Sequence, residues 1–232
     1  LSELHYNLAS KIIPLGSQTF SKSVTQYPFG VSPLYMEKAK GSKIWDVDGN
    51  EYIDLVNALA SITIGYNNKK VNFAIKKQLK KGTIFSLPAM LEHQVSELLV
   101  NLIPCAEMVR FGKNGSDVTS AAIRLARAYT NRDLVLVCGY HGWQDWYIGS
   151  TSKNKGVPKA VSNLTHSFKF NDIESLRELF LKYPGQIAAV ILEPMNFEFP
   201  KDNFLKEIRE LCNLHSSILI FDETITGFRF SN

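Results

Sequence analysis

The sequence contains the run Ile187-Ala188-Ala189-Val190-Ile191-Leu192-Glu193-Pro194 and, after a helical segment at about 203–215, the run Ile218-Leu219-Ile220-Phe221-Asp222-Glu223-Thr224. Each run begins with four to six apolar residues, the length of a strand that is buried on both faces, and then turns to carboxylates. Two such strands separated by a helix are typical of a βαβ unit, in which the strands are parallel. The sequence therefore predicts an α/β protein with a mostly parallel sheet.

The same alternation of strands and helices extends toward the N-terminus. Short apolar runs at 108–111 and 134–138 are predicted as strands, and helices are predicted at about 117–129 and 172–182. A parallel sheet of this kind carries helices on both of its faces. Two further helices are expected, one from Asn68 to the stop at Gly82 and one through 94–99 to the stop at Pro104.

The N-terminal part of the chain has a different character. It is rich in proline and glycine up to about Ser42, so it should be mostly extended or looped after a short amphipathic start. Asp48-Gly49 between two β-prone runs then predicts a hairpin, because this pair accepts the positive φ angles of a two-residue turn. We expect residues 1–67 to form an N-terminal segment, part of a small domain, and residues 68–232 to form the first part of a large domain. A start at Leu1 and an end at Asn232, straight after a compact motif, predict a piece of a longer chain.

Composition narrows the class of protein. At 232 residues the chain can bury a core without disulfides, and its net charge of +4 is too mild to indicate nucleic-acid binding. The cysteines Cys105, Cys138 and Cys212 have neither CxxC spacing nor a close pair, which favours a reducing, cytoplasmic setting. No membrane span or signal peptide is evident. We expect a cytoplasmic protein without nucleic-acid or membrane partners.

The residues that follow the predicted strands are polar. In an open parallel sheet, ligands bind beyond the carboxyl ends of the strands. Gly115 and Ser116 precede an alanine-rich helix, whose free amides and dipole would favour a phosphate, although an ordinary N-cap by Ser116 or Asp117 explains the same residues. Tyr140 and His141 would suit a planar ligand, although an aromatic residue at a strand end also packs in cores.

Two carboxylates lie at strand ends. Asp222 follows a run expected to be central in the sheet, so it needs a cationic or hydrogen-bonding partner. Pairing with Arg229, or capping of the next segment, would meet that need without any ligand. Glu193 presents the same alternatives, since it can bond to the backbone beside Pro194. No ligand pair at metal-binding spacing joins these carboxylates with His141, so no metal site is predicted.

Taken in order, these motifs resemble those of the class III aminotransferase family, most closely its glutamate-1-semialdehyde aminomutase branch. The resemblance covers about 13–230 and rests on five segments: 45–54, an early hairpin; 113–130, a phosphate loop and helix; 140–142, an aromatic-His-Gly motif; and two carboxylate motifs at 191–194 and 221–229. Five motifs in the same order make chance agreement very improbable.

The resemblance implies a type I fold of the enzymes that depend on pyridoxal 5'-phosphate (PLP), with PLP as cofactor. It implies transfer of an amino group between an amino compound and an aldehyde or ketone, or the related internal shift, in a homodimer. It also places the lysine that forms a Schiff base with PLP beyond residue 232. The alternative is a module with the same fold that lacks the lysine and is non-catalytic, or that runs a different PLP reaction.

The resemblance also assigns the residues around the cofactor. The PLP phosphate would be held by Asn114, Gly115 and Ser116, where the aminomutases have Ser-Gly-Thr. The ring would lie between Tyr140 and Thr224, the latter at a position that is commonly valine. The first departure keeps small polar groups that tolerate a phosphate, and in the second threonine is similar to valine in shape.

The same resemblance also implies roles for the ionisable residues of the site. Asp222 is the predicted catalytic residue, because a carboxylate beside the ring nitrogen keeps that nitrogen protonated and lets the ring take up electrons. Glu193 would lie near the ring oxygen or the substrate, and His141 would support the site.

Three positions depart from the aminomutase pattern on the substrate side. Lys22 stands where an arginine is expected to bind a substrate carboxylate, and a solvent-facing lysine is an equally good interpretation. Ala58 and Leu59 stand where serine and tryptophan are expected. These departures put the aminomutase substrate in doubt and leave the cofactor assignment intact.

Overall fold

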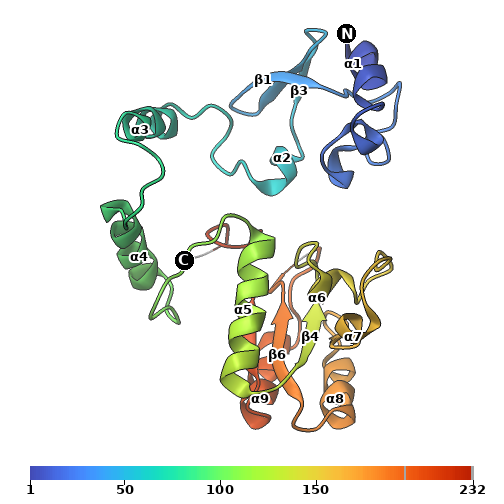
Figure 1. Cartoon of the computed structure of the whole chain (residues 1–232), viewed down its shortest axis with the longest axis vertical. Coiled ribbons are helices and arrows are strands. Elements are labelled where there is room, and N and C mark those ends of the chain that lie inside the picture. The colour runs from blue at the N-terminus through green and yellow to red at the C-terminus, as the bar shows by residue number, and fades with distance from the viewer. Residues whose placement is uncertain (196, 231–232) are drawn as a thin grey trace. The chain divides into compact units, whose positions relative to one another are not determined.

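The computed structural model describes residues 1–195 and 197–230 and contains two compact units, Leu1–Ala89 and Met90–Asn232 (Figure 1). Ser231 and Asn232, the last two residues of the sequence, lie outside the described residues. The division into small-domain and large-domain segments at residues 67 and 68 stays a prediction, because compactness alone does not assign a segment to a domain.

The first unit contains a three-stranded antiparallel sheet in the order β1 (Met36–Lys40), β2 (Lys43–Asp46), β3 (Glu51–Ile53). The pairing of Trp45 with Glu51 confirms the predicted hairpin. Its turn is longer than the predicted two residues, because the Asp46 carboxylate accepts hydrogen bonds from the amides of Asp48 and Asn50 and closes a wider loop. The sequence did not predict β1, whose Met-Glu-Lys-Ala-Lys composition is poor in β-branched and aromatic residues.

The helices of the first unit are α1 (Ser2–Ala9), η1 (Pro14–Gly16), η2 (Phe20–Lys22), α2 (Asn57–Ala60) and α3 (Lys69–Leu79). The last of these confirms the predicted helix after Asn68, whose side chain caps it. In α2 all four residues have positive φ, from 50° to 65°, so this turn is left-handed. The Asp54 carboxylate holds it by accepting the amides of Val56, Asn57 and Ala58.

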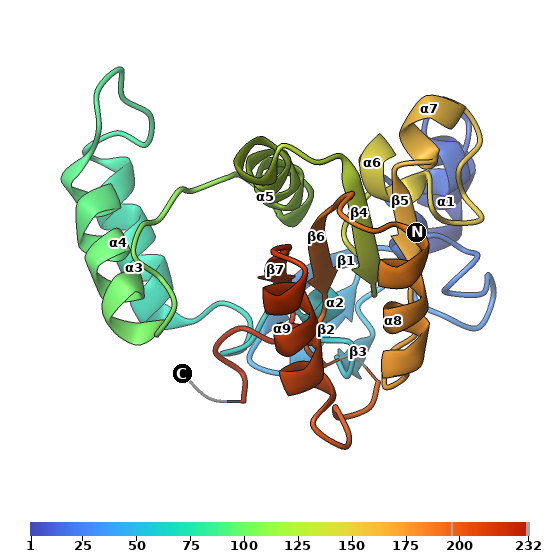
Figure 2. The ribbon, with the colours of Figure 1, turned by 90° about the horizontal axis from the view of Figure 1, so that it is seen from below.

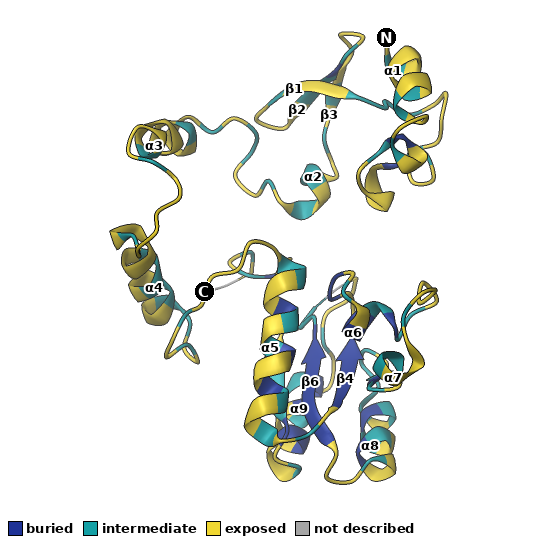
Figure 3. Cartoon of the chain, viewed as in Figure 1, coloured by how far each residue is buried: buried dark blue, intermediate teal, exposed yellow. Residues whose placement is uncertain are grey.

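The second unit contains a four-stranded parallel sheet in the order β5 (Thr165–Ser167), β4 (Leu134–Cys138), β6 (Ile187–Leu192), β7 (Ile218–Phe221). The pairing registers are parallel throughout, which confirms the predicted class of sheet. Every residue of β4 and β6 is buried, as their continuous apolar sequences require (Figure 3).

Helices cover both faces of this sheet. The helices of the unit are α4 (Met90–Leu102), α5 (Gly115–Thr130), α6 (Asp145–Ile148), α7 (Lys159–Ser162), α8 (Ile173–Lys182) and α9 (Phe204–Leu214). One face packs against α5 through Ile123 and Ala126, and the other packs against α8 and α9 through Leu176 and Ile208 (Figure 2). Each fully buried Leu or Ile side chain contributes about 1.5–3 kcal/mol to folding. In the described part of the chain, no helix is both long enough and apolar enough to cross a membrane.

Two predictions about strands were wrong. Residues 108–111 are not a strand, and Met108 is 93% exposed, because this apolar segment pairs with no neighbouring strand among the described residues. The strand β7 lies at the edge of the described sheet and not at its centre. Asp222, which follows β7, is still joined to the end of β6, because its N–H donates to the Leu192 carbonyl oxygen at 2.9 Å.

Candidate functional site

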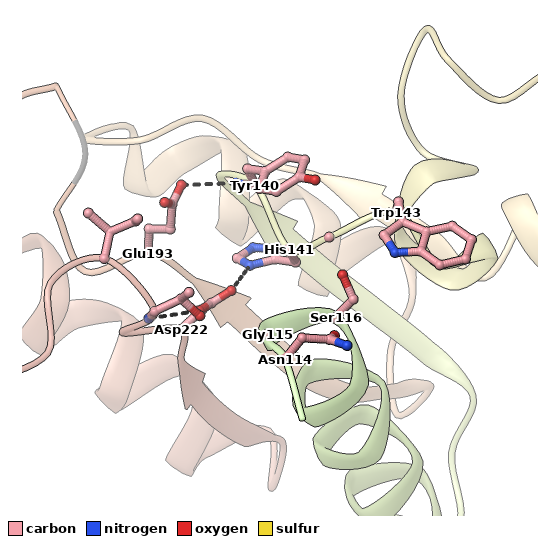
Figure 4. Close-up of a pocket in the computed structure, with 11 residues that line it drawn as sticks. Asn114, Gly115, Ser116, Tyr140, His141, Trp143, Glu193 and Asp222 are labelled. Atoms are coloured by element: carbon pink, nitrogen blue, oxygen red, sulfur yellow. Dashed lines mark hydrogen bonds and ion pairs between the residues drawn. The ribbon is translucent and has the colours of Figure 1, made fainter. Parts of the chain in front are cut away.

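The carboxyl ends of β4, β6 and β7 meet the N-terminus of α5 around a cavity of about 320 Å³ (Figure 4). All eight residues singled out in the sequence line this cavity: Asn114, Gly115, Ser116, Tyr140, His141, Glu193, Asp222 and Thr224. Its size is that of a site for a small organic ligand. The structure thus brings together residues from four separate segments of the chain.

Three further residues line the cavity and were missed in the sequence: Gly142, Trp143 and Ile225. Trp143 is 70% exposed, which is unusual for a tryptophan that does not contact a ligand or partner. Its place just after an apolar strand was the signal that could have identified it.

The N-terminus of α5 forms one wall of the cavity. Its N-cap is Asn114, whose side chain accepts the amide of Asp117 at 2.9 Å, so the alternative in which Ser116 or Asp117 caps the helix is wrong. The amides of Gly115 and Ser116 have no intrahelical carbonyl to bind, since they belong to the first turn. Together with the helix dipole, they make this wall suited to an anion.

Glycine is required where the loop after β4 approaches this helix. Gly142 has φ +104°, and a Cβ at this position would overlap the Ser116 side chain. A Cβ at Gly115 would lie 3.2 Å from Thr224 Oγ1, tighter than ordinary contacts. Only glycine lets the backbone come this close, so the two segments form a narrow cradle at the helix end.

Asp222 is buried, with 8% of its surface exposed, and both of its oxygens are used. Oδ2 lies 2.8 Å from His141 Nδ1, while Oδ1 accepts from the Thr224 amide at 3.1 Å and the Thr224 hydroxyl at 2.6 Å. Burial raises the pKa of Asp222, but the hydrogen bonds from His141 and Thr224 lower it by more. The pKa therefore lies below its ordinary value, and the carboxylate is ionised at neutral pH.

His141 is held at both ring nitrogens and is 1% exposed. Its Nε2 donates to the Cys138 carbonyl oxygen at 3.2 Å, because that oxygen can only accept. Its Nδ1 lies 2.8 Å from Asp222 Oδ2. The ring is therefore fixed in place, and both of its nitrogens are occupied within the protein. It is suited to hold Asp222 and not to exchange protons with a ligand.

Tyr140 and Glu193 form the side of the cavity opposite the helix end. Tyr140 lines the cavity and is 62% exposed, so it is not a core-packing residue. Its backbone N–H donates to Glu193 Oε2 at 2.9 Å. Glu193 thus bonds to backbone of the loop after β4.

The nearby thiol is inert. Burial, with a smaller contribution from the charge of Glu193, raises the pKa of Cys138 to about 11, so the group is protonated at neutral pH and is no nucleophile. Among residues 1–195 and 197–230, no cluster of three or more His, Cys, Asp or Glu side chains could hold a metal ion. The substrate-side positions Lys22, Ala58 and Leu59 belong to the first unit, in η2 and α2.

Fold and cavity together define an α/β protein that holds a small ligand at the carboxyl edge of a parallel sheet. Residues 26–231 match the family model described as aminotransferase class III. The chain belongs to the class III aminotransferase family.

Two individual relatives support this family assignment. The chain is 38% identical, over 246 residues, to a protein of Desulforamulus reducens named glutamate-1-semialdehyde 2,1-aminomutase, a match that covers 99% of this chain and 56% of the relative. A similar match joins it to the protein of the same name in Acetivibrio thermocellus, with 38% identity over 99% of this chain and 57% of the relative. The chain therefore spans about half the length of these relatives.

Solved structures give the same fold. The FumI protein of Sphingopyxis sp. MTA144, solved in its PLP internal aldimine form, superposes with a TM-score of 0.86 at 28% identity, covering 94% of this chain and 53% of that one. An omega-transaminase from Sphaerobacter thermophilus superposes with a TM-score of 0.84 at 28% identity, covering 95% and 54%. These likenesses confirm the predicted type of α/β fold.

Proposed function

We propose that the protein containing this chain is an enzyme that uses PLP to transfer an amino group, as an aminotransferase or as an aminomutase. The supporting observation is that one cavity combines a helix N-terminus, an exposed aromatic ring and a buried ionised carboxylate. These features suit the three recognisable parts of PLP, which are a phosphate, a flat ring and a ring nitrogen that can carry a proton.

Each part of the cofactor has residues that fit it. Asn114, Gly115 and Ser116, at the helix end, would hold the phosphate. Tyr140 and Thr224 would lie on the two faces of the ring. An added Cβ at Gly115 would make a tight contact with Thr224 Oγ1 at 3.2 Å, which is consistent with a glycine that lets the backbone approach an anion closely.

Asp222 is the residue of this chain that would take part most directly in the proposed reaction. When bound, PLP supplies a sink for the electrons released as a bond to the substrate's α-carbon breaks. Asp222 would accept a hydrogen bond from the protonated ring nitrogen and hold the proton there, because its own pKa is lowered. His141 and Thr224 fix the carboxylate in place and keep it ionised.

The substrate side distinguishes the two reactions. The donor would be an amino compound and the acceptor an aldehyde or ketone, while an aminomutase would move the group within one molecule. Glu193 lies at the cavity wall, where it would face the ring oxygen or the substrate. Lys22, Ala58 and Leu59 differ from the aminomutase pattern, which favours a substrate other than glutamate 1-semialdehyde.

Two broader features belong to the same proposal. We expect a homodimer, since class III aminotransferases build their sites at a two-fold interface. We also expect a cytoplasmic protein, which is consistent with three cysteines that are all free thiols.

The test uses the full-length protein loaded with PLP. An amino donor added alone should abolish the visible absorption band of bound PLP, and a carbonyl acceptor added afterwards should restore it. Glutamate 1-semialdehyde, tested separately, distinguishes the aminomutase from the aminotransferase. A visible band that no amino donor changes would contradict amino-group transfer and would favour the non-catalytic module.

A further inference from the structure

The backbone on both sides of Tyr140 is held by side chains from three other segments. The Tyr147 hydroxyl, in α6, donates to the Gly139 carbonyl at 2.8 Å. The Thr119 hydroxyl, in α5, donates to the His141 carbonyl at 3.0 Å. The Tyr140 amide itself donates to Glu193 Oε2 at 2.9 Å. Tyr140 is thus 62% exposed, while the main-chain polar groups on both sides of it are hydrogen-bonded to side chains.

The two donors that flank Tyr140 are buried. Thr119 is 5% exposed and Tyr147 is 6% exposed. Burial raises the pKa of Tyr147 to about 12, so its hydroxyl keeps its hydrogen at any working pH. A buried carbonyl that loses its donor pays about 1–3 kcal/mol in desolvation, so removal of the Thr119 hydroxyl from the buried His141 carbonyl should loosen the segment. Gly139 is exposed, so removal of the Tyr147 hydroxyl should loosen the segment by less.

Thr119 also joins this segment to the helix end. Its hydroxyl lies 3.2 Å from the Ser116 carbonyl as well as near the His141 carbonyl. At the next residue of α5, Ser120 Oγ accepts from Trp146 Nε1 at 2.9 Å, which ties α6 to α5 as well. The position of the Tyr140 ring relative to the first turn of α5 is therefore set by side chains of α5.

We propose that Thr119 and Tyr147 are positioning residues that fix the Tyr140 ring over the anion-binding end of α5. The inference rests on the proposed function, since Tyr140 is the residue expected to stack on the PLP ring. In the part of the chain that the structure describes, neither residue lines the cavity, so both act through Tyr140 and His141. Through these two hydroxyls, the packing of α5 and α6 sets the distance between the Tyr140 ring and the residues proposed to hold the phosphate.

The test compares variants of the full-length protein. Thr119→Val removes the hydroxyl at constant shape, Thr119→Ser keeps it, and Tyr147→Phe removes the second donor. Thr130→Val and Tyr183→Phe are matched controls, because the Thr130 hydroxyl bonds within α5 to Ala126 and the Tyr183 ring stacks on His166.

The first readout needs no cofactor. Amide hydrogen exchange of peptides covering residues 139–143 should become about tenfold faster in Thr119→Val, as expected for the loss of one buried hydrogen bond. It should become faster by a smaller factor in Tyr147→Phe, because the acceptor residue Gly139 is exposed. It should stay at the wild-type rate in Thr119→Ser and in both controls. Equal exchange in Thr119→Val and wild type, or Thr119→Ser as fast as Thr119→Val, would overturn the positioning role.

The second readout is PLP itself. Thr119→Val and Tyr147→Phe should raise the Kd of PLP about tenfold and weaken the visible circular dichroism of the bound cofactor, with Thr119→Ser restoring both. Wild-type Kd and dichroism in Thr119→Val would overturn the proposed link to the ring. Failure of the wild-type protein to bind PLP would instead overturn the proposed function, while the exchange rates would still decide how the segment is held.

Discussion

At the scale of single residues, the centre of the site is a carboxylate that stays ionised although it is buried. The apolar run before Asp222 was enough to predict that this group needs a partner. It was not enough to identify the partner, because His141 lies 81 positions away in the sequence and meets Asp222 only when β4 and β7 lie in one sheet. The Arg229 pairing considered from the sequence is replaced by His141 and Thr224.

A prediction at this scale concerns Gly115. Replacement by valine should raise the Kd of PLP at least about tenfold, because the new side chain would press on Thr224 and fill the cradle at the helix end. Ala121→Val on the exposed face of the same helix is the control for adding a β-branched residue. Titration of PLP by its absorbance measures both. If the Kd of PLP is unchanged in Gly115→Val, this loop is an ordinary helix start and does not hold the phosphate.

At the scale of elements, segments with a clear apolar, helical or turn pattern were predictable, and short segments without one were not. The strands β4, β6 and β7 follow from continuous apolar runs, and α5, α8 and α9 follow from helical periodicity within one or two residues at each end. The 3-residue strand β5 and the left-handed turn α2 carry no such signal. In α2, Asn57-Ala58-Leu59-Ala60 lacks glycine, so nothing local indicates positive φ, and the Asp54 carboxylate imposes it.

The strain in α2 leads to a stability prediction. Ala58 has φ 50° and ψ 49°, a conformation that costs a residue with a Cβ about 1–2 kcal/mol and costs glycine almost nothing. Ala58→Gly should therefore raise the free energy of unfolding of its surroundings by about 0.5–1 kcal/mol after the entropy of glycine is subtracted.

The control for this prediction is a substitution with the opposite expected effect on stability. Ala121→Gly, on the exposed face of the right-handed helix α5, should lower stability by about 1 kcal/mol. Hydrogen exchange of the surrounding peptides in increasing urea measures the local free energy in each case. Destabilisation by both substitutions would show that α2 is not strained.

At the scale of the whole molecule, sequence order and sheet topology explain why one cavity forms. Parallel strands end at the same edge, so polar residues that follow β4, β6 and β7 are brought together although Tyr140 and Thr224 are 84 positions apart in the sequence. That rule predicted the polar residues after these strands that line the cavity, but it missed Trp143 and Ile225. It did not predict how the lining residues are held, since nothing in the sequence distinguishes the hydroxyls of Thr119 and Tyr147 from those of other helical residues.

The central claim is that Asp222 is the carboxylate that makes bound PLP reactive. The most direct test is Asp222→Ala in the full-length protein, with Kd for PLP and kcat for amino transfer measured side by side. Asp133→Ala, an exposed carboxylate at the opposite edge of the sheet, is the control. We predict that kcat falls about 100- to 1000-fold while the Kd of PLP rises less than about tenfold, because phosphate and ring contacts remain. A near-normal kcat in Asp222→Ala, with PLP bound, would contradict the account.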